Sequence, residues 1–366
     1  MKTRVAMMFG GKTVEHEVSV ISGVQACMAM DTAKYEIIPV YLTKDNDMYI
    51  GAGIGDITSY KDIPALLKNS QRVIMVNDDG RLSMIPYPLK KWGGSKPVGF
   101  DVAFPVVHGT NVEDGALQGY LKTLGIPFVG PDVTAAAISM DKFITKAVLK
   151  EAGIPVLDAE VYTLSDYQEM DGLISRIEET FGYPVIIKPV NLGSSVGISI
   201  AKSRSELVNS LDNAFMYATR VLAEHAVSNL REINCSVLGD ENDAVASECE
   251  EPMHTKDILS YEDKYVSGGG SKGAKSGAAK TGMTTAAAGS TATGGSQAAG
   301  NTGGGYKSNG SGMANLARKI PADLTPEQRE EVRSLAVRAF QALGCNGVSR
   351  IDFMIDEDTG KLYFNE

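Results

Sequence analysis

The clearest local sign of chemistry in the sequence is a lysine followed by a loop of small residues. In the run KPVNLGSSVG, Lys188 ends an apolar stretch, and Ser194 and Ser195 lie in the loop that leads to the next one. Such a loop exposes backbone N–H groups to a polyphosphate, and the lysine adds a positive charge. The run matches neither GxxxxGK[ST] nor GxGxxG. It predicts phosphate binding, with an ordinary hairpin turn as the alternative.

Two carboxylates near the C-terminal end could share a metal ion. Apolar stretches flank the turn cluster DEDTG, and a hairpin centred on Thr359 would place Asp352 opposite Glu366, on the face that also carries Arg350. Facing carboxylates repel each other, and a divalent cation such as Mg²⁺ would remove that cost. The pattern predicts a metal site, with a solvated acidic face as the alternative. A slip of one residue would separate the two carboxylates.

Two polar segments follow predicted strands and precede predicted helices. VHGTNVEDG carries His108, and GGKTVEHEVS carries Glu15 and Glu17. Ligands of open α/β sheets bind at this end of the strands. His108 could orient a polar group or act as an acid or base, and one of the glutamates could bind an ammonium group. The alternatives are a structural histidine and acids that only favour a helix start.

Lys264 and Tyr265 belong to a third polar segment, YEDKY, directly before a stretch of small residues. A lysine and tyrosines on a mobile loop fit a lid that closes over an anionic ligand, whereas the alternative is an ordinary exposed loop. Glu224 and Glu232, taken alone, would be routine surface acids.

Alternating strands and helices must position these segments. Apolar runs at 4–9, 35–42 and 101–107 predict strands with helices between them. This alternation predicts an α/β unit with an open, mostly parallel sheet over residues 1–130.

Two further units are expected, over residues 131–225 and 226–366. The first of these begins with a predicted helix over 134–152 and contains the lysine loop, and the second contains the C-terminal hairpin.

Glycine is concentrated in one segment of this 366-residue chain. Of its 39 glycines, 15 lie in residues 266–312, which contain no acid and no Leu, Ile, Phe or Trp. Such a composition cannot bury apolar surface, so we expect a flexible insertion there.

The chain as a whole is acidic, with a net charge of −10. This balance argues against nucleic acid or a membrane surface as a partner, and no stretch reaches the about 18 apolar residues of a membrane span. The N-terminal apolar run is too short for a signal peptide. The four scattered cysteines fit a reducing cytoplasm.

Together, and in this order, the motifs resemble those of the D-alanine–D-alanine ligases of the ATP-grasp superfamily. The matching segments are GGKTVEHEVS, VVHGTNVEDGALQGYL, PFVG followed by SMDK, VIIKPVNLGSSVGIS, YEDKY and CNGVSRIDF. The likeness covers nearly all of the chain except 266–312. It implies a three-domain ATP-grasp fold of mixed α and β structure, with ATP between the last two domains. The implied enzyme joins two D-alanines through an acyl phosphate, for peptidoglycan precursors.

The resemblance also implies roles for single residues at an ATP site. Those expected to bind ATP are Lys142, Lys188, Ser194, Ser195, Glu224, Glu232 and Lys264. Glu224 would meet the adenine amino group, Glu232 the ribose hydroxyls and Lys264 the γ-phosphate.

For the first D-alanine, the resemblance implies that Glu15 holds the ammonium group, supported by Ser194 and Tyr265. Val18 and His108 would complete this substrate site. Arg350 would stabilise the oxyanion of the tetrahedral intermediate.

By the same resemblance, Asp352 and Glu366 would bind Mg²⁺ or Mn²⁺. The enzyme is expected to be a cytoplasmic homodimer.

Two features depart from the family pattern: the insertion, and the end of the sequence at Glu366, where the family continues with Asn-x-x-Pro-Gly and a final helix. We therefore expect a truncated sequence, and a chain that binds ATP but ligates poorly or not at all is an alternative to the active ligase. D-serine or D-lactate remains an alternative second substrate, although Tyr265 favours D-alanine or D-serine. A non-catalytic nucleotide-binding module is the alternative of another class.

Overall fold

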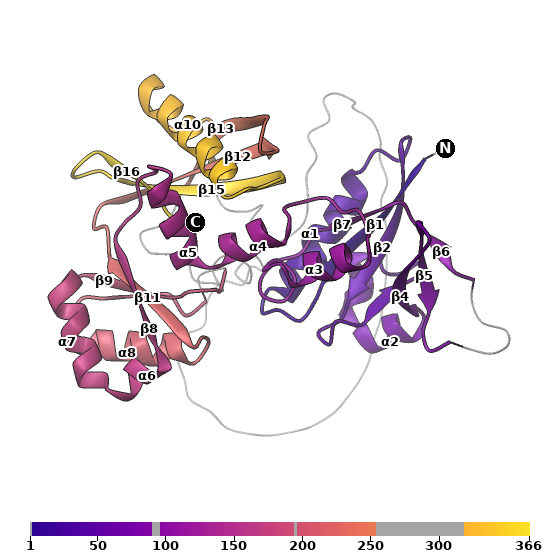
Figure 1. Ribbon diagram of the computed structural model, residues 1–366, viewed down its shortest axis with the longest axis horizontal. Coiled ribbons are helices and arrows are strands. Elements are labelled where there is room, and N and C mark those ends of the chain that lie inside the picture. The colour runs from indigo at the N-terminus through magenta and orange to yellow at the C-terminus, as the bar shows by residue number, and fades with distance from the viewer. Residues whose placement is uncertain (1, 90–95, 194–195, 254–317) are drawn as a thin grey trace, which may run out of the picture.

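The computed structural model describes residues 2–89, 96–193, 196–253 and 318–366, which three β-sheets organise (Figure 1). Several predicted features lie outside these residues: Ser194, Ser195, Lys264, Tyr265 and the insertion at 266–312. In the described ranges, no helix is long and apolar enough to cross a membrane. The domain boundaries at 130 and 225 stay predictions.

The first sheet has seven strands in the order β6-β5-β4-β3-β2-β1-β7. The strands are β1 (Thr3–Gly10), β2 (Tyr35–Leu42), β3 (Met48–Ile50), β4 (Gln71–Asp78), β5 (Arg81–Pro86), β6 (Val98–Gly99) and β7 (Val102–Pro105). The pairs of β1 with β2 and β7 are parallel, but the four pairs from β2 to β6 are antiparallel. The expectation of a mostly parallel sheet is therefore wrong. Short turns such as Asp79–Gly80 between β4 and β5 allow only antiparallel pairing.

Helices cover the two faces of β1 in this sheet. Their bounds are α1 (His16–Ala29), η1 (Ile57–Lys61), α2 (Ile63–Lys68) and α3 (Ala116–Thr123). Met7 and Phe9 pack with residues of α1, while Ala6 and Met8 pack with residues of α3. Because alternate residues point to opposite faces and both faces are covered, β1 is apolar from Val5 to Phe9. It ends where the first polar segment begins.

Two helices, α4 (Val133–Met140) and α5 (Lys142–Glu151), replace the single helix predicted over 134–152. The break is at Asp141, whose carboxylate accepts hydrogen bonds from the backbone N–H groups of Phe143 and Ile144, at 3.1 and 3.0 Å. An aspartate in this position caps a new helix. It also places Lys142 at the first position of α5.

The second sheet is antiparallel, in the order β10-β9-β11-β8. Its elements are β8 (Ala159–Thr163), α6 (Leu164–Gln168), α7 (Met170–Phe181), β9 (Val185–Pro189), β10 (Ser199–Ala201), α8 (Arg204–Phe215) and β11 (Arg220–His225). Val185, Ile187, Val221 and Ala223 pack in one core with residues of α7 and α8, and Figure 1 shows these helices on one side of the sheet. The alternate positions, which include Lys188 and Glu224, therefore lie on the other face.

The third sheet has the order β14-β13-β12-β15-β16. Its elements are β12 (Leu230–Gly239), β13 (Ala244–Pro252), β14 (Arg318–Lys319), α10 (Pro326–Ala342), β15 (Gly347–Asp356) and β16 (Lys361–Phe364). Ile233, Ile351 and Phe353 form a core with residues of α10. Glu232 and Asp352 alternate with them and so lie on the face away from α10.

Candidate active site

Lys188, at the end of β9, is buried among polar partners. Its Nζ lies 2.5 Å from Oε1 of Glu224 on the neighbouring strand β11 and 3.2 Å from Oδ1 of Asn365 near the C-terminal end. The lysine therefore joins the polar face of the second sheet to the third sheet.

Lys146, which the sequence analysis missed, contacts the other oxygen of Glu224, with Nζ 2.7 Å from Oε2. Burial alone would raise the pKa of Glu224, but the two lysines hold it below its ordinary value. A signal was present in the sequence: Lys142 and Lys146 are four residues apart, and on a helix such residues share a face. Both are buried.

Lys142 joins the lysine loop to the C-terminal end of the chain. Its Nζ donates to the carbonyl oxygen of Leu192 at 2.6 Å and forms an ion pair with Oε1 of Glu366 at 2.7 Å. Its backbone N–H donates to the carbonyl of Val190 at 3.0 Å. The predicted phosphate-binding loop is thus held from the start of α5.

The C-terminal hairpin differs from the predicted register by one residue. Asp356 pairs with Lys361, and continuing this register places Asp352 opposite Asn365, not opposite Glu366. The reason is the four-residue turn, whose centre lies between Asp358 and Thr359. Glu366 follows the end of β16, and its carbonyl accepts from the backbone N–H of Asp352 at 2.7 Å.

Asp352 is paired with Arg350 on the same strand. The guanidinium donates to both carboxylate oxygens, from Nε at 2.8 Å and from Nη2 at 2.9 Å. Burial raises the pKa of Asp352, the charges of Glu366 and Glu232 add to this, and Arg350 opposes it. The direct pairing of the two carboxylates, on which the metal prediction relied, is therefore wrong. The charge of Glu366 nevertheless still acts on Asp352.

The donor set of this site is small. Among the residues that the structure describes, no group of three or more His, Cys, Asp or Glu side chains could hold a metal ion. Asp352 and Glu366 offer the hard oxygen donors that Mg²⁺ prefers, and Mg²⁺ often takes its remaining ligands from water and phosphate. The residues present thus fit a cation bound together with a phosphate-bearing substrate.

Glu15, the residue before α1, lies where three loops meet. A Cβ atom built on Gly109 or on Gly193 would lie 2.8 Å from its Oε2 atom. The carboxylate is buried, at 6% exposure. The structure thus brings together the first polar segment, the segment that carries His108 and the lysine loop, which are far apart in the sequence.

His108 lies on this same side, with Nε2 3.1 Å from the hydroxyl of Ser22 on α1. Burial lowers its pKa, and the nearby charge of Arg350 adds to the effect. Val18 is half-buried one turn before Ser22 on α1. Glu113, which the sequence analysis did not single out, accepts from the backbone N–H of Gly109 at 2.7 Å.

Desolvation by the surrounding protein raises the pKa of Glu113 to about 7, and the charges of Glu15, Glu366 and Asp114 add to the shift. The Glu113 residue is nevertheless exposed to solvent. The charges of Glu15, after β1, and of Glu366, after β16, both act on Glu113, so acids of the first and third sheets lie near one another.

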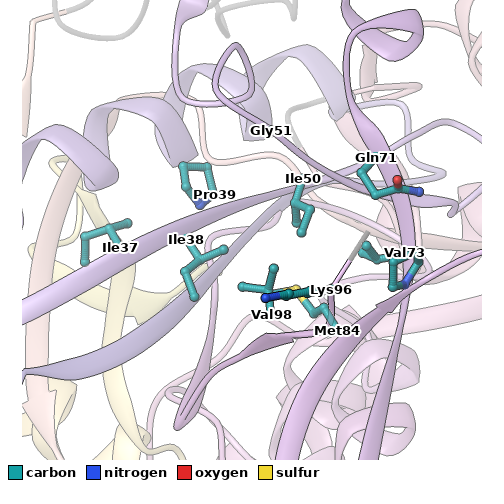
Figure 2. A pocket seen from close by; sticks show the side chains of 11 residues that line it. Ile37, Ile38, Pro39, Ile50, Gly51, Gln71, Val73, Met84, Lys96 and Val98 are labelled. Atoms are coloured by element: carbon teal, nitrogen blue, oxygen red, sulfur yellow. The ribbon is translucent and has the colours of Figure 1, made fainter. Parts of the chain in front are cut away.

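Two hollows lie apart from this cluster and contain none of the predicted site residues. Figure 2 shows one, of about 360 Å³, which Ile38, Ile50, Val73, Met84 and Val98 line on the first sheet. The other, of about 390 Å³, lies beside α3.

Family models match the chain in two parts. The D-Ala–D-Ala ligase N-terminus model matches residues 4–131, and the D-Ala–D-Ala ligase C-terminus model matches 148–291 and 305–366.

Curated relatives have the same family name. A D-alanine–D-alanine ligase of Caldicellulosiruptor bescii is 35% identical over 367 residues, covering 100% of this chain and 85% of the relative. One from Clostridium novyi is 36% identical over 373 residues, covering 100% and 88%.

Solved structures agree. The VanG D-Ala:D-Ser ligase of Enterococcus faecalis superposes with a TM-score of 0.73 at 26% identity, covering 100% of this chain and 90% of that one. The D-alanine–D-alanine ligase of Coxiella burnetii gives 0.72 at 25% identity, covering 100% and 84%. The fold is thus the ATP-grasp fold of ligases that the motifs indicated. Within that class, the chain belongs to the D-alanine–D-alanine ligase family.

Proposed function

We propose that this chain joins two D-alanines with ATP to form D-alanyl-D-alanine for peptidoglycan. The observation that carries the proposal is the meeting of Glu15, an acid suited to a substrate ammonium, with the lysine loop at Gly193. One site can then hold an amino acid and the phosphates of ATP. The full-length likeness to D-alanine–D-alanine ligases supports this assignment.

ATP would lie between the polar faces of the second and third sheets. Lys142 and Lys188 would bind its phosphates. The ammonium group of Lys142 contacts the carbonyl of Leu192 in the lysine loop, and Lys188 lies on β9, the strand that leads into this loop. Glu232, half-buried on β12, would meet the ribose. Glu224 would meet the adenine amino group with lone pairs that the lysines leave. Ser194, Ser195 and Lys264 would close over the phosphates.

The first D-alanine would bind with its ammonium on Glu15, which Ser194 and Tyr265 support. Val18 and His108 would line the rest of its site. A neutral His108 is favoured by burial and by Arg350, so its ring can accept one hydrogen bond and donate another.

Asp352 and Glu366 would hold Mg²⁺ or Mn²⁺. Each carboxylate keeps lone pairs beyond those that Arg350 and Lys142 use. When bound, the cation would supply charge stabilisation for the transferred phosphoryl group.

In the reaction, the carboxylate of the first D-alanine attacks the γ-phosphoryl group of ATP, and ADP leaves. Lys142 and Lys188 neutralise charge that develops on the phosphates. The amine of the second D-alanine then attacks the acyl phosphate. Arg350 stabilises the oxyanion, and phosphate leaves as the peptide bond forms.

We further propose that the enzyme works in the cytoplasm as a homodimer on small-molecule substrates, without nucleic acid or membrane as a partner.

ADP release with D-alanine, D-serine or D-lactate in turn tests the proposal. D-alanine alone should support release, as the names of the two curated relatives suggest. The similar VanG structure, a D-Ala:D-Ser ligase, is the reason to test D-serine. Release that needs D-serine beside D-alanine would favour the D-alanine–D-serine alternative. ATP binding without release under any condition would favour a catalytically impaired nucleotide-binding chain.

A further inference from the structure

Two lysines share one buried glutamate, and the proposed reaction uses only one of them. Nζ of Lys188 lies 2.5 Å from Oε1 of Glu224, and Nζ of Lys146 lies 2.7 Å from Oε2. All three side chains are buried, with Glu224 only 1% exposed. Lys146 also donates to the carbonyl oxygen of Leu157 at 3.3 Å.

The charges of this triad explain why a second lysine is useful. A buried carboxylate is stable only with a cationic or hydrogen-bonding partner. If Lys188 were the only cation beside Glu224, the two side chains would form a neutral pair. A polyphosphate would then compete with Glu224 for the ammonium group of Lys188. With Lys146 on the second oxygen, the triad has one net positive charge.

We propose that Lys146 is a positioning residue for ATP binding: it neutralises Glu224 at its second oxygen, so that the charge of Lys188 stays available to the phosphates. The inference rests on the proposed phosphate role of Lys188. Lys146 acts through Glu224 and does not touch the nucleotide. Contacts on both carboxylate oxygens also fix the carboxylate, and with it the Nζ position of Lys188.

A double-mutant cycle tests the inference, with binding of ADP and Mg²⁺ to the full chain measured by calorimetry. Lys146→Met should weaken binding about tenfold, because Glu224 then holds Lys188 alone. Glu224→Gln sets the reference affinity of the cycle, because it changes both the ion pairs and the proposed contact with the adenine amino group. When Glu224 is already Gln, adding Lys146→Met should change affinity by less than about twofold.

Lys150→Met is the matched control, because Lys150 is on the same helix but pairs with Asp158 at the surface. It should leave the affinity unchanged. Circular dichroism checks folding, since removing one partner of a buried pair destabilises a protein more than removing both. If Lys146→Met does not fold, Lys146→Gln replaces it and keeps a hydrogen-bond donor without the charge.

The two proposals fail in different ways. If Lys188→Met leaves ADP affinity unchanged, the phosphate role of Lys188 is wrong, and the inference falls with it. If Lys188→Met weakens binding but the single Lys146 variant does not, Lys146 has no positioning role. The same holds if Lys146→Met weakens binding as much in the Glu224→Gln background as in the wild type, since Lys146 would then not act through Glu224.

Discussion

Arg350 is proposed to stabilise the oxyanion of the tetrahedral intermediate, and this role can be tested separately from ATP binding. Its guanidinium holds Asp352 through two hydrogen bonds and lowers the pKa of His108 by its charge. Arg350→Ala should lower kcat on the order of 100- to 1,000-fold, as loss of one oxyanion donor does elsewhere, with ATP affinity nearly unchanged. Steady-state kinetics and ADP calorimetry check this. Unchanged turnover would remove its assigned role.

His108 gives a pH prediction at the same scale. Its pKa is lowered below 6.5 in the folded protein, so below that pH the unfolded chain binds more protons. Stability should therefore fall as the pH falls through about 6.5. His108→Gln should weaken this dependence, measured by urea unfolding at pH 5.5 and 7.5. Equal slopes for wild type and His108→Gln would contradict the cause assigned to the shift.

At the scale of elements, the close approach of loops can be tested at Gly193. A Cβ there would lie 2.8 Å from Glu15 Oε2, so Gly193→Ala must displace one of the two. Because a displacement of about 1 Å can cost on the order of 100-fold in rate, kcat/KM for D-alanine should fall by 10- to 100-fold. Gly172→Ala is the control: it lies in α7 with open space around it and should leave kinetics unchanged. A normal kcat/KM in Gly193→Ala would exclude this loop contact.

The cap of α5 joins helix stability to the site. Asp141 caps the helix that carries Lys142 and Lys146 and forms an ion pair with Arg220 at 2.6 Å. Asp141→Ala should cost about 1–2 kcal/mol of stability and also raise the KM for ATP. Thr325→Ala, which removes the cap of α10, should lower stability alone. Equal ATP kinetics in both variants would show that α5 needs no cap to hold its lysines.

Local sequence patterns predicted the positions of strands and helices better than they predicted how the strands pair. The strand predicted at 35–42 has the bounds of β2, because a continuous apolar run between turn residues is a local signal. The break at Asp141 depended on one side chain turning back to cap a helix. The hairpin register depended on the length of its turn. A shift of half a residue in the turn centre changes the residue opposite Asp352 from Glu366 to Asn365.

Within the site, residue types were predictable but their contacts were not. Lys188 and Glu224 were singled out by motif and resemblance, yet their ion pair requires two strands that are adjacent only in the folded sheet. Lys146 had no motif, so its role could be found only from its contact with Glu224.

For the whole molecule, the central claim is that three sheets, distant in the sequence, meet to form one ligase site. The most direct measurement incubates the protein with ATP, Mg²⁺ and D-alanine and follows the products by mass spectrometry. The account predicts D-alanyl-D-alanine in a one-to-one ratio with ADP and phosphate, and its formation on the order of 100- to 1,000-fold more slowly with Arg350→Ala. ADP formed without the dipeptide, or nucleotide bound without either product, would contradict it.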